Sequence, residues 1–76
     1  MKALELFKKL GYKYFKNSFR ITYENHSNNN CKTIEFDLQE QEIYLADDDE
    51  EIVTLSKEEL QAINIQIKEL KWSYKK

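Results

Sequence analysis

Three stretches of this chain alternate apolar and polar residues with a period of two, and this alternation constrains the fold more than any other feature. The stretches are SFRITYE at 18–24, KTIEFDL at 32–38 and EIYLA at 42–46. Neighbouring side chains of a strand point to opposite faces, so each stretch predicts a strand with one buried and one wet face. Such strands are typical of an antiparallel sheet covered on one side only. Short polar segments, 25–30 and 39–41, are predicted to link them.

A helical period is found on both sides of the predicted strands. Residues 2–10 predict a short first helix, and Gly11, the only glycine, stands where a helix commonly ends in a left-handed residue. Ser56 and Glu59 have the spacing of a capping box that begins a second helix, with Leu55 and Leu60 placed as a hydrophobic staple. We expect this helix to run to about residue 72 or 74, with one apolar face made of Leu60, Ile63, Ile67, Leu70 and Tyr74.

The order of these elements predicts one α+β domain over residues 1–76. It has a short N-terminal helix, a meander of three or four antiparallel strands and a C-terminal helix, with both helices on one face of the sheet. A core of this size contributes only about 3–5 kcal/mol unless something staples it. The single cysteine excludes an internal disulfide and fits a reduced, cytoplasmic setting. The N-terminus has no signal-peptide pattern and no apolar run could span a membrane, so we expect a cytoplasmic protein.

Charge is distributed unevenly along the chain, although the net charge is only −2. Residues 1–20 carry six Lys or Arg against one acid, residues 21–60 carry two Lys against twelve acids, and residues 61–76 carry four Lys against one acid. Such blocks bear on partners and on electrostatic steering rather than on the fold.

Five acids in a row, Asp47, Asp48, Asp49, Glu50 and Glu51, form the most acidic segment. An EF-hand loop beginning at Asp47 would need a glycine at its sixth position, and Ile52 stands there instead. We therefore predict no calcium site. Two interpretations stay open for the segment: a solvated hairpin tip, or a negatively charged surface for a partner.

The residue types that carry common chemistries are too few for a recognisable site. Zinc and iron sites need three or four His or Cys ligands, whereas this chain has His26 and Cys31 alone. We expect these two to lie at opposite ends of a polar loop with no third group to orient them, and so not to form a nucleophile–base pair. Gly11 alone cannot build a phosphate-cradling loop. The sequence thus predicts no enzyme activity, no metal and no cofactor.

Two further segments are candidates for partner contact. Residues 8–20, KKLGYKYFKNSFR, interleave basic and aromatic residues as nucleic-acid surfaces do, but the chain is acidic overall and Phe19 is expected to serve the small core. On the second helix, Ala62, Ile65 and Trp72 lie roughly opposite the main apolar face. They form either a contact patch, for instance of a homodimer, or a helix tail that wraps the core with Trp72 covering its edge.

The segments LFKKLGYKY, FRITYE, TIEFDLQEQEIYL and EELQAINIQIKELKW resemble those of small proteins encoded in phages and prophages of low-GC Gram-positive bacteria. The resemblance covers nearly the whole chain and is most specific at Gly11–Tyr12 and at Glu58–Asn64. Family members often carry glycine before the final tryptophan, where this chain has Lys71, so the helix is expected to continue into WSYKK. The resemblance implies a genomic context and transfers no functional residues.

We therefore expect a non-enzymatic phage or prophage accessory protein that binds and modulates a host macromolecule, for example as an anti-CRISPR-like inhibitor of a host defence. The expected partner is a host protein such as a nucleic-acid-binding protein or nuclease. Acids on one face of a strand recur about every 6.6 Å, of the order of the phosphate spacing along one nucleic-acid strand. The candidate partner-binding residues are Asp47, Asp48, Asp49, Glu50, Glu51, Ile65 and Trp72. The alternatives are a self-associating module that uses the C-terminal helix, and a nucleic-acid-binding protein that uses the basic N-terminal segment.

Overall fold

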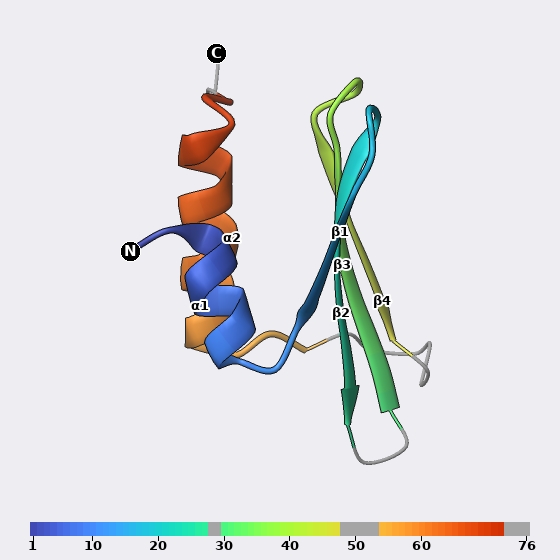
Figure 1. Ribbon diagram of the computed structural model, residues 1–76, viewed down its shortest axis with the longest axis vertical. Helices are drawn as coiled ribbons and strands as arrows, with labels where there is room; N and C mark the ends of the chain where they lie inside the picture. Colours follow the sequence, from blue (N-terminus) through green and yellow to red (C-terminus); the bar gives the residue numbers. More distant parts are fainter. Residues whose placement is uncertain (28–29, 48–53, 73–76) are drawn as a thin grey trace.

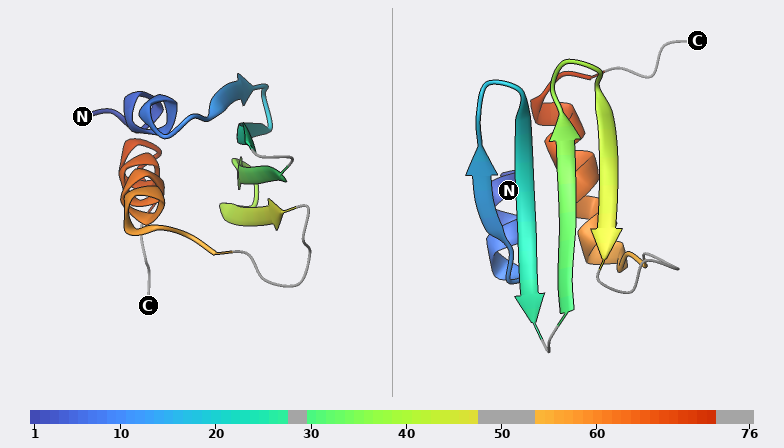
Figure 2. Two further views of the ribbon diagram at one scale, coloured as in Figure 1. Left: turned by 90° about the horizontal axis from the view of Figure 1, so that it is seen from below. Right: turned by 90° about the vertical axis from the view of Figure 1, so that its right-hand side faces the viewer.

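The computed structural model, which describes residues 1–27, 30–47 and 54–72, has two layers. Two helices form one layer and a four-stranded antiparallel sheet forms the other, and both helices cover the same face of the sheet (Figures 1 and 2). The elements are α1 (Ala3–Lys9), β1 (Lys13–Lys16), β2 (Arg20–Ser27), β3 (Asn30–Asp37), β4 (Glu42–Asp47) and α2 (Lys57–Glu69). The predicted α+β architecture is confirmed. No helix among the described residues is long and apolar enough to cross a bilayer.

The sheet is a meander in which the strands follow one another in the order β1-β2-β3-β4. The three predicted strands are present and correspond to β2, β3 and β4. The remaining strand, β1, was missed. It lies at the edge, where all four of its residues are exposed, so it shows no buried alternation for a sequence pattern to reveal.

The hairpin between β2 and β3 extends further than the sequence predicts. His26 pairs with Cys31 in the ladder, and both strands continue into the segment 25–30 that was expected to be a loop. The prediction was wrong because these polar residues pair across the two strands. Asn25, paired with Lys32, also has a tertiary contact, since its side-chain amide donates a hydrogen bond to the carbonyl of Leu10, 3.1 Å away, just after α1. Polar residues thus extend the ladder beyond the apolar alternation.

The turn between β3 and β4 lies where the sequence predicts a link. Asp37 organises it, because its Oδ1 atom accepts hydrogen bonds from the backbone amides of Gln39 and Glu40, each at 2.9 Å. Gln41 completes the turn with a left-handed φ of 57°.

The core lies between the helices and the inner face of the sheet. The Phe7 ring of α1 stacks on Tyr23 of β2, with ring centroids 3.8 Å apart and planes within 18°. Gly11 ends the first helical segment with a φ of 96°, as its position predicts. The buried apolar residues are Ala3, Phe7, Tyr12, Ile21, Tyr23, Ile34, Phe36, Ala62, Ile63 and Ile67.

Helix α2 begins as predicted, but its buried face and its end differ from the prediction. Ser56 caps it, with Oγ accepting from the Glu59 amide at 3.1 Å. Its buried residues are Glu59, Ala62, Ile63, Gln66 and Ile67, whereas Leu60 is 50% exposed. The buried stripe keeps Ile63 and Ile67 but is rotated by about half a residue, or about 50°, because two polar side chains, Glu59 and Gln66, occupy it and satisfy their hydrogen bonds there. The helix ends at Glu69, and Lys71 has a left-handed φ of 60° instead of continuing it.

Candidate functional site

The acidic segment enters the described structure only at Asp47, since Asp48, Asp49, Glu50 and Glu51 lie outside the described residues. Asp47 is the last residue of β4, is partly buried, and pairs in the ladder with Lys32 of β3. Its position in a strand beside a lysine therefore differs from that of a solvated hairpin tip. The interpretation of the other four acids stays a prediction.

The two apolar candidates on the last helical segment lie against the core. Ile65 and Trp72 are partly buried and pack on it, and the Trp72 ring lies 6.2 Å from that of Phe36. Ala62, which was grouped with them, is fully buried. Of the two interpretations, the helix end that covers the edge of the core matches these contacts, and the exposed stripe does not. Partner binding through Ile65 and Trp72 stays a prediction.

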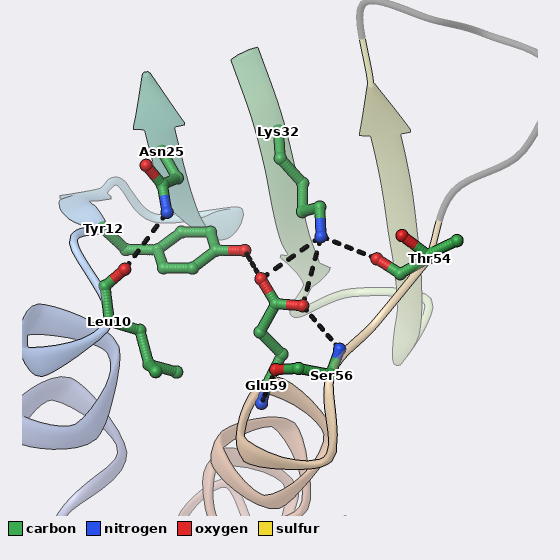
Figure 3. A network of polar contacts seen from close by, with 7 residues as sticks. All are labelled: Leu10, Tyr12, Asn25, Lys32, Thr54, Ser56 and Glu59. Carbon is green, nitrogen blue, oxygen red and sulfur yellow. Dashed lines mark hydrogen bonds and ion pairs between the residues drawn. The ribbon is translucent and has the colours of Figure 1, made fainter. Parts of the chain in front are cut away.

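A network of polar side chains joins α2 to the sheet and to the segment after α1 (Figure 3). The Glu59 carboxylate accepts a hydrogen bond from the Tyr12 hydroxyl at 2.5 Å and one from the Ser56 amide at 2.8 Å. Lys32 Nζ lies 3.1 Å and 3.3 Å from its two oxygens and donates to the carbonyl of Thr54 at 2.6 Å. One buried carboxylate therefore holds the start of α2, strand β3 and the segment that follows α1.

The electrostatics of this network favour an ionised Glu59. Burial alone would raise the pKa of Glu59, but the hydrogen bonds from Tyr12 and Ser56 and the charge of Lys32 lower it below its ordinary value. Burial and the Glu59 carboxylate raise the pKa of Tyr12. Among the described residues, no buried side-chain nitrogen or oxygen lacks a hydrogen-bond partner. We interpret the network as stabilising the fold, because the Glu59 carboxylate already accepts hydrogen bonds from three donors of the chain itself: Tyr12, Lys32 and Ser56.

His26 and Cys31 are neighbours across β2 and β3, which corrects the expectation that they lie at opposite ends of a loop. The Cys31 sulfur lies 3.7 Å from His26 Nε2, and a Glu24 oxygen lies 3.1 Å from the same nitrogen. In a nucleophile–base–orienter triad the two partners contact different ring nitrogens. Among the described residues no three His, Cys, Asp or Glu side chains are grouped to hold a metal. The cluster therefore has the geometry of a cross-strand polar contact.

One face of the sheet, which we call the open face, points away from both helices (Figure 2, right). The register places four residues in one row across it: Phe15, Thr22, Glu35 and Tyr44. The aromatic rings at the two ends of this row are 50% and 49% exposed. From the sequence, Phe15 was a candidate only as part of the basic segment 8–20, and Tyr44 was not a candidate, because exposed aromatics in a strand pattern cannot be told from core residues before the covered face is known.

On β3 and β4, every charged side chain that faces outward is a carboxylate: Glu35, Asp37 and Glu42, where Asp37 and Glu42 are direct cross-strand partners. We call these three acids together with Tyr44 the acidic patch. Arg20 of β2 contacts its border, with the guanidinium 3.5 Å from Glu35. The Tyr44 hydroxyl donates to Glu42 at 2.6 Å. That hydrogen bond and the Glu42 charge are the main causes that raise the pKa of Tyr44, and the charges of Asp37 and Glu40 add to them.

The signal for the acidic patch was present in the sequence as the polar half of the β3 and β4 alternation. Only the pairing register shows that these acids meet at one corner of the open face. No protein-family model, curated protein or solved structure matches this chain.

Proposed function

We propose that this chain is a non-enzymatic binding protein that engages a basic surface of another macromolecule through the open face of its sheet. The observation that carries the proposal is the acidic patch, which joins three outward carboxylates to an exposed aromatic ring on a face that no described residue covers. Aromatic residues supply contact area and charge supplies specificity and rapid association at protein interfaces.

Direct cross-strand pairing of Asp37 with Glu42 supports a role outside folding. Like charges opposite each other on a sheet destabilise it. Arg20 is the β2 partner of Asp37 in the ladder and its guanidinium contacts Glu35, so this cation lies on the Asp37 side of the pair, whereas Glu42 belongs to edge strand β4. The Asp37 side chain has a structural role, because it accepts hydrogen bonds from backbone amides of the turn. The Glu42 side chain, by contrast, makes no hydrogen bond to the backbone of any described residue. A cation from a partner would relieve this repulsion on binding.

The partner class that fits this charge is a protein with a basic surface, such as a nucleic-acid-binding protein or a nuclease. Asp48 to Glu51 follow β4 directly in the sequence and add four acids to the segment that starts at Asp47. A biological role as a phage or prophage accessory protein, including inhibition of a host defence, rests on the sequence resemblance alone. We include this biological role in the proposal on the basis of the resemblance.

A capture experiment with salt dependence tests the proposal. The unmodified chain, immobilised and incubated with host lysate, is expected to retain a basic protein, and retention is expected to weaken from 50 to 500 mM salt, since exposed charge attraction is screened over about 8–10 Å at physiological salt. A double variant, Glu35→Gln with Glu42→Gln, should lose that protein. The matched control, Glu5→Gln with Glu58→Gln, removes the same charge from exposed helix positions and should retain it. Equal retention by both variants would contradict the proposal.

A specific observation also favours a second candidate, binding of nucleic acid by the basic segment. Phe19, expected in the core, is 56% exposed, and it lies in the chain next to Arg20 and near the exposed Phe15. Exposed aromatics among basic residues can stack on bases. Binding of mixed single-stranded DNA and RNA that weakens with salt and is lost with Phe15→Ser and Phe19→Ser would support it. No binding at 50 mM salt would exclude it.

A further inference from the structure

We propose that Tyr44 and Glu42 form an anchor for an arginine side chain of the protein partner. This inference rests on the proposed function, because it names the chemical group that the open face would recognise. The acidic patch explains attraction to any cation, whereas the Tyr44–Glu42 pair explains a preference for a planar one.

The Tyr44 and Glu42 side chains lie next to each other on the outer side of edge strand β4. They are two residues apart and so share a face, and the Tyr44 hydroxyl donates to Glu42 Oε1 at 2.6 Å. The ring is 49% exposed, and Glu42 is exposed as well. An incoming group can therefore contact the ring and the carboxylate together.

A guanidinium matches this pair better than an ammonium does. It is planar, it stacks on aromatic rings, and its fork of N–H donors fits a carboxylate, whereas a lysine ammonium is a compact and strongly hydrated point charge. The chain itself contains one example on the same face, where the Arg20 guanidinium lies 3.5 Å from Glu35. That arginine belongs to β2, in the cross-strand row Arg20, Asp37 and Glu42, and is separated from Glu42 and Tyr44 of β4 by strand β3.

Negative charge is concentrated around the Tyr44 ring. Glu42 lies on the same strand, Asp37 is the cross-strand partner of Glu42, and Glu40 lies in the adjoining turn. The hydrogen bond to Glu42, followed by the charges of these acids, raises the pKa of Tyr44. The negative potential of these acids disfavours the ionised form of Tyr44, and the same potential favours a cation placed against the face of its ring.

The test compares two probe peptides with the full chain. One is a blocked Gly/Ser peptide with three arginines, and the other carries lysine at the same positions. Dissociation constants are measured by NMR titration at 50 mM and 300 mM salt. We expect the arginine peptide to bind about two- to fivefold more tightly, the range that a cation–aromatic contact supplies at an exposed site. Tyr44→Leu should abolish this preference while retaining salt-dependent binding of both peptides. Phe15→Leu, which removes the ring at the other end of the same row, should leave the preference unchanged.

The outcomes separate this inference from the proposed function. If both peptides bind equally and both weaken with salt, the arginine anchor is wrong and the acidic binding surface stands. If neither peptide binds at 50 mM salt, both proposals are wrong. If gel filtration shows a dimer that Glu42→Lys dissociates, the patch is covered by a second copy of the chain and the anchor is again wrong. A preference that survives Tyr44→Leu would also overturn the inference.

Discussion

The Tyr12 hydroxyl lies 2.5 Å from Glu59 Oε2 and donates a hydrogen bond to it, joining residues that are 47 positions apart in the sequence. The same carboxylate closes the capping box of α2 and pairs with Lys32 of β3. Local helix capping and tertiary packing therefore depend on one buried side chain. Because of this coupling, we expect small substitutions in the Glu59 network to change the free energy of unfolding measurably.

Tyr12→Phe removes one donor to a charged acceptor and leaves the ring in place. We expect the free energy of unfolding at pH 7 to fall by about 1.5–3 kcal/mol. We also expect stability to fall less steeply on acidification, because losing a hydrogen bond that lowers the pKa of Glu59 moves its folded-state pKa up toward the ordinary value. Urea denaturation between pH 3 and 7, followed by the emission of the single tryptophan, Trp72, measures both effects. Tyr23→Phe is the matched control: it removes a hydroxyl that donates to the uncharged Gln66 at 2.6 Å, so it should lower the free energy of unfolding by a similar amount at every pH and leave its pH dependence unchanged.

The pH dependence of stability should carry the signature of a carboxylate with a lowered pKa. The pKa of Glu59 in the folded chain lies below its ordinary value of 4.5, so its stabilising effect is fully present above about pH 4.5. The effect is lost as the pH falls through the folded-state pKa, because the unfolded chain binds the proton first. Glu59→Gln should flatten this part of the profile. It should also destabilise the fold at pH 7 toward the lower end of about 3–5 kcal/mol, since Lys32 loses its ion-pair partner and keeps Thr54. If stability depends on pH in this variant as it does in the unmodified chain, another group causes the loss of stability at acidic pH.

Ser56→Ala should lower the free energy of unfolding by about 1 kcal/mol, because the amide of Glu59 loses its side-chain acceptor. The measurement is the urea midpoint at constant m-value. Ser56→Thr retains a hydroxyl at the cap and should lose less. A midpoint unchanged by Ser56→Ala would show that the cap does not stabilise α2.

The face that α2 buries is tested by two aliphatic truncations three residues apart. Ile63→Ala should cost about 2–5 kcal/mol, because this side chain is buried in the core. Leu60→Ala should change stability by no more than about 0.5 kcal/mol, because Leu60 is exposed. Thermal melting of both variants gives the comparison. A loss from Leu60→Ala as large as that from Ile63→Ala would restore the helix face predicted from the sequence, which contains both residues.

Lys71→Gly should stabilise the chain. Lys71 holds a φ of 60°, a conformation that costs a residue with a Cβ atom about 1–2 kcal/mol. Glycine removes this strain but gains freedom in the unfolded chain, which offsets about 0.4–1 kcal/mol, so we expect a net gain of about 0.5 kcal/mol. Lys71→Ala removes the same charge, keeps the strain and should give no gain. Equal melting temperatures for the glycine and alanine variants would contradict this explanation.

Local patterns predicted most elements of the fold. Alternation located β2, β3 and β4, Gly11 marked the end of the first helical segment, and Ser56 with Glu59 marked the start of α2. These succeeded because each depends on interactions within a few residues. β1 and the continuation of the ladder to His26 and Cys31 were missed, because exposed and polar residues become strand there only by pairing with a neighbour.

The candidate site was less predictable than the fold. The sequence drew attention to Asp47–Glu51, Ile65 and Trp72, of which the structure places Asp47 beside Lys32 and packs Ile65 and Trp72 on the core. Glu42 and Tyr44 were not candidates, and Phe15 was one only as part of the basic segment 8–20. These residue types are common in strands. They become candidates only because they lie on the face of the sheet that the helices leave open.

The sequence by itself determined where the strands β2 to β4 run and where the helices begin, since backbone hydrogen bonding, capping and alternation are local properties of the chain. Only the tertiary structure decided which face of α2 is buried. Glu59 and Gln66 would be expected in solvent, yet Tyr12, Lys32 and Tyr23 meet them inside and offset the cost of their burial. The same packing decided which face of the sheet stays open, and with it where three carboxylates and two aromatic rings face solvent.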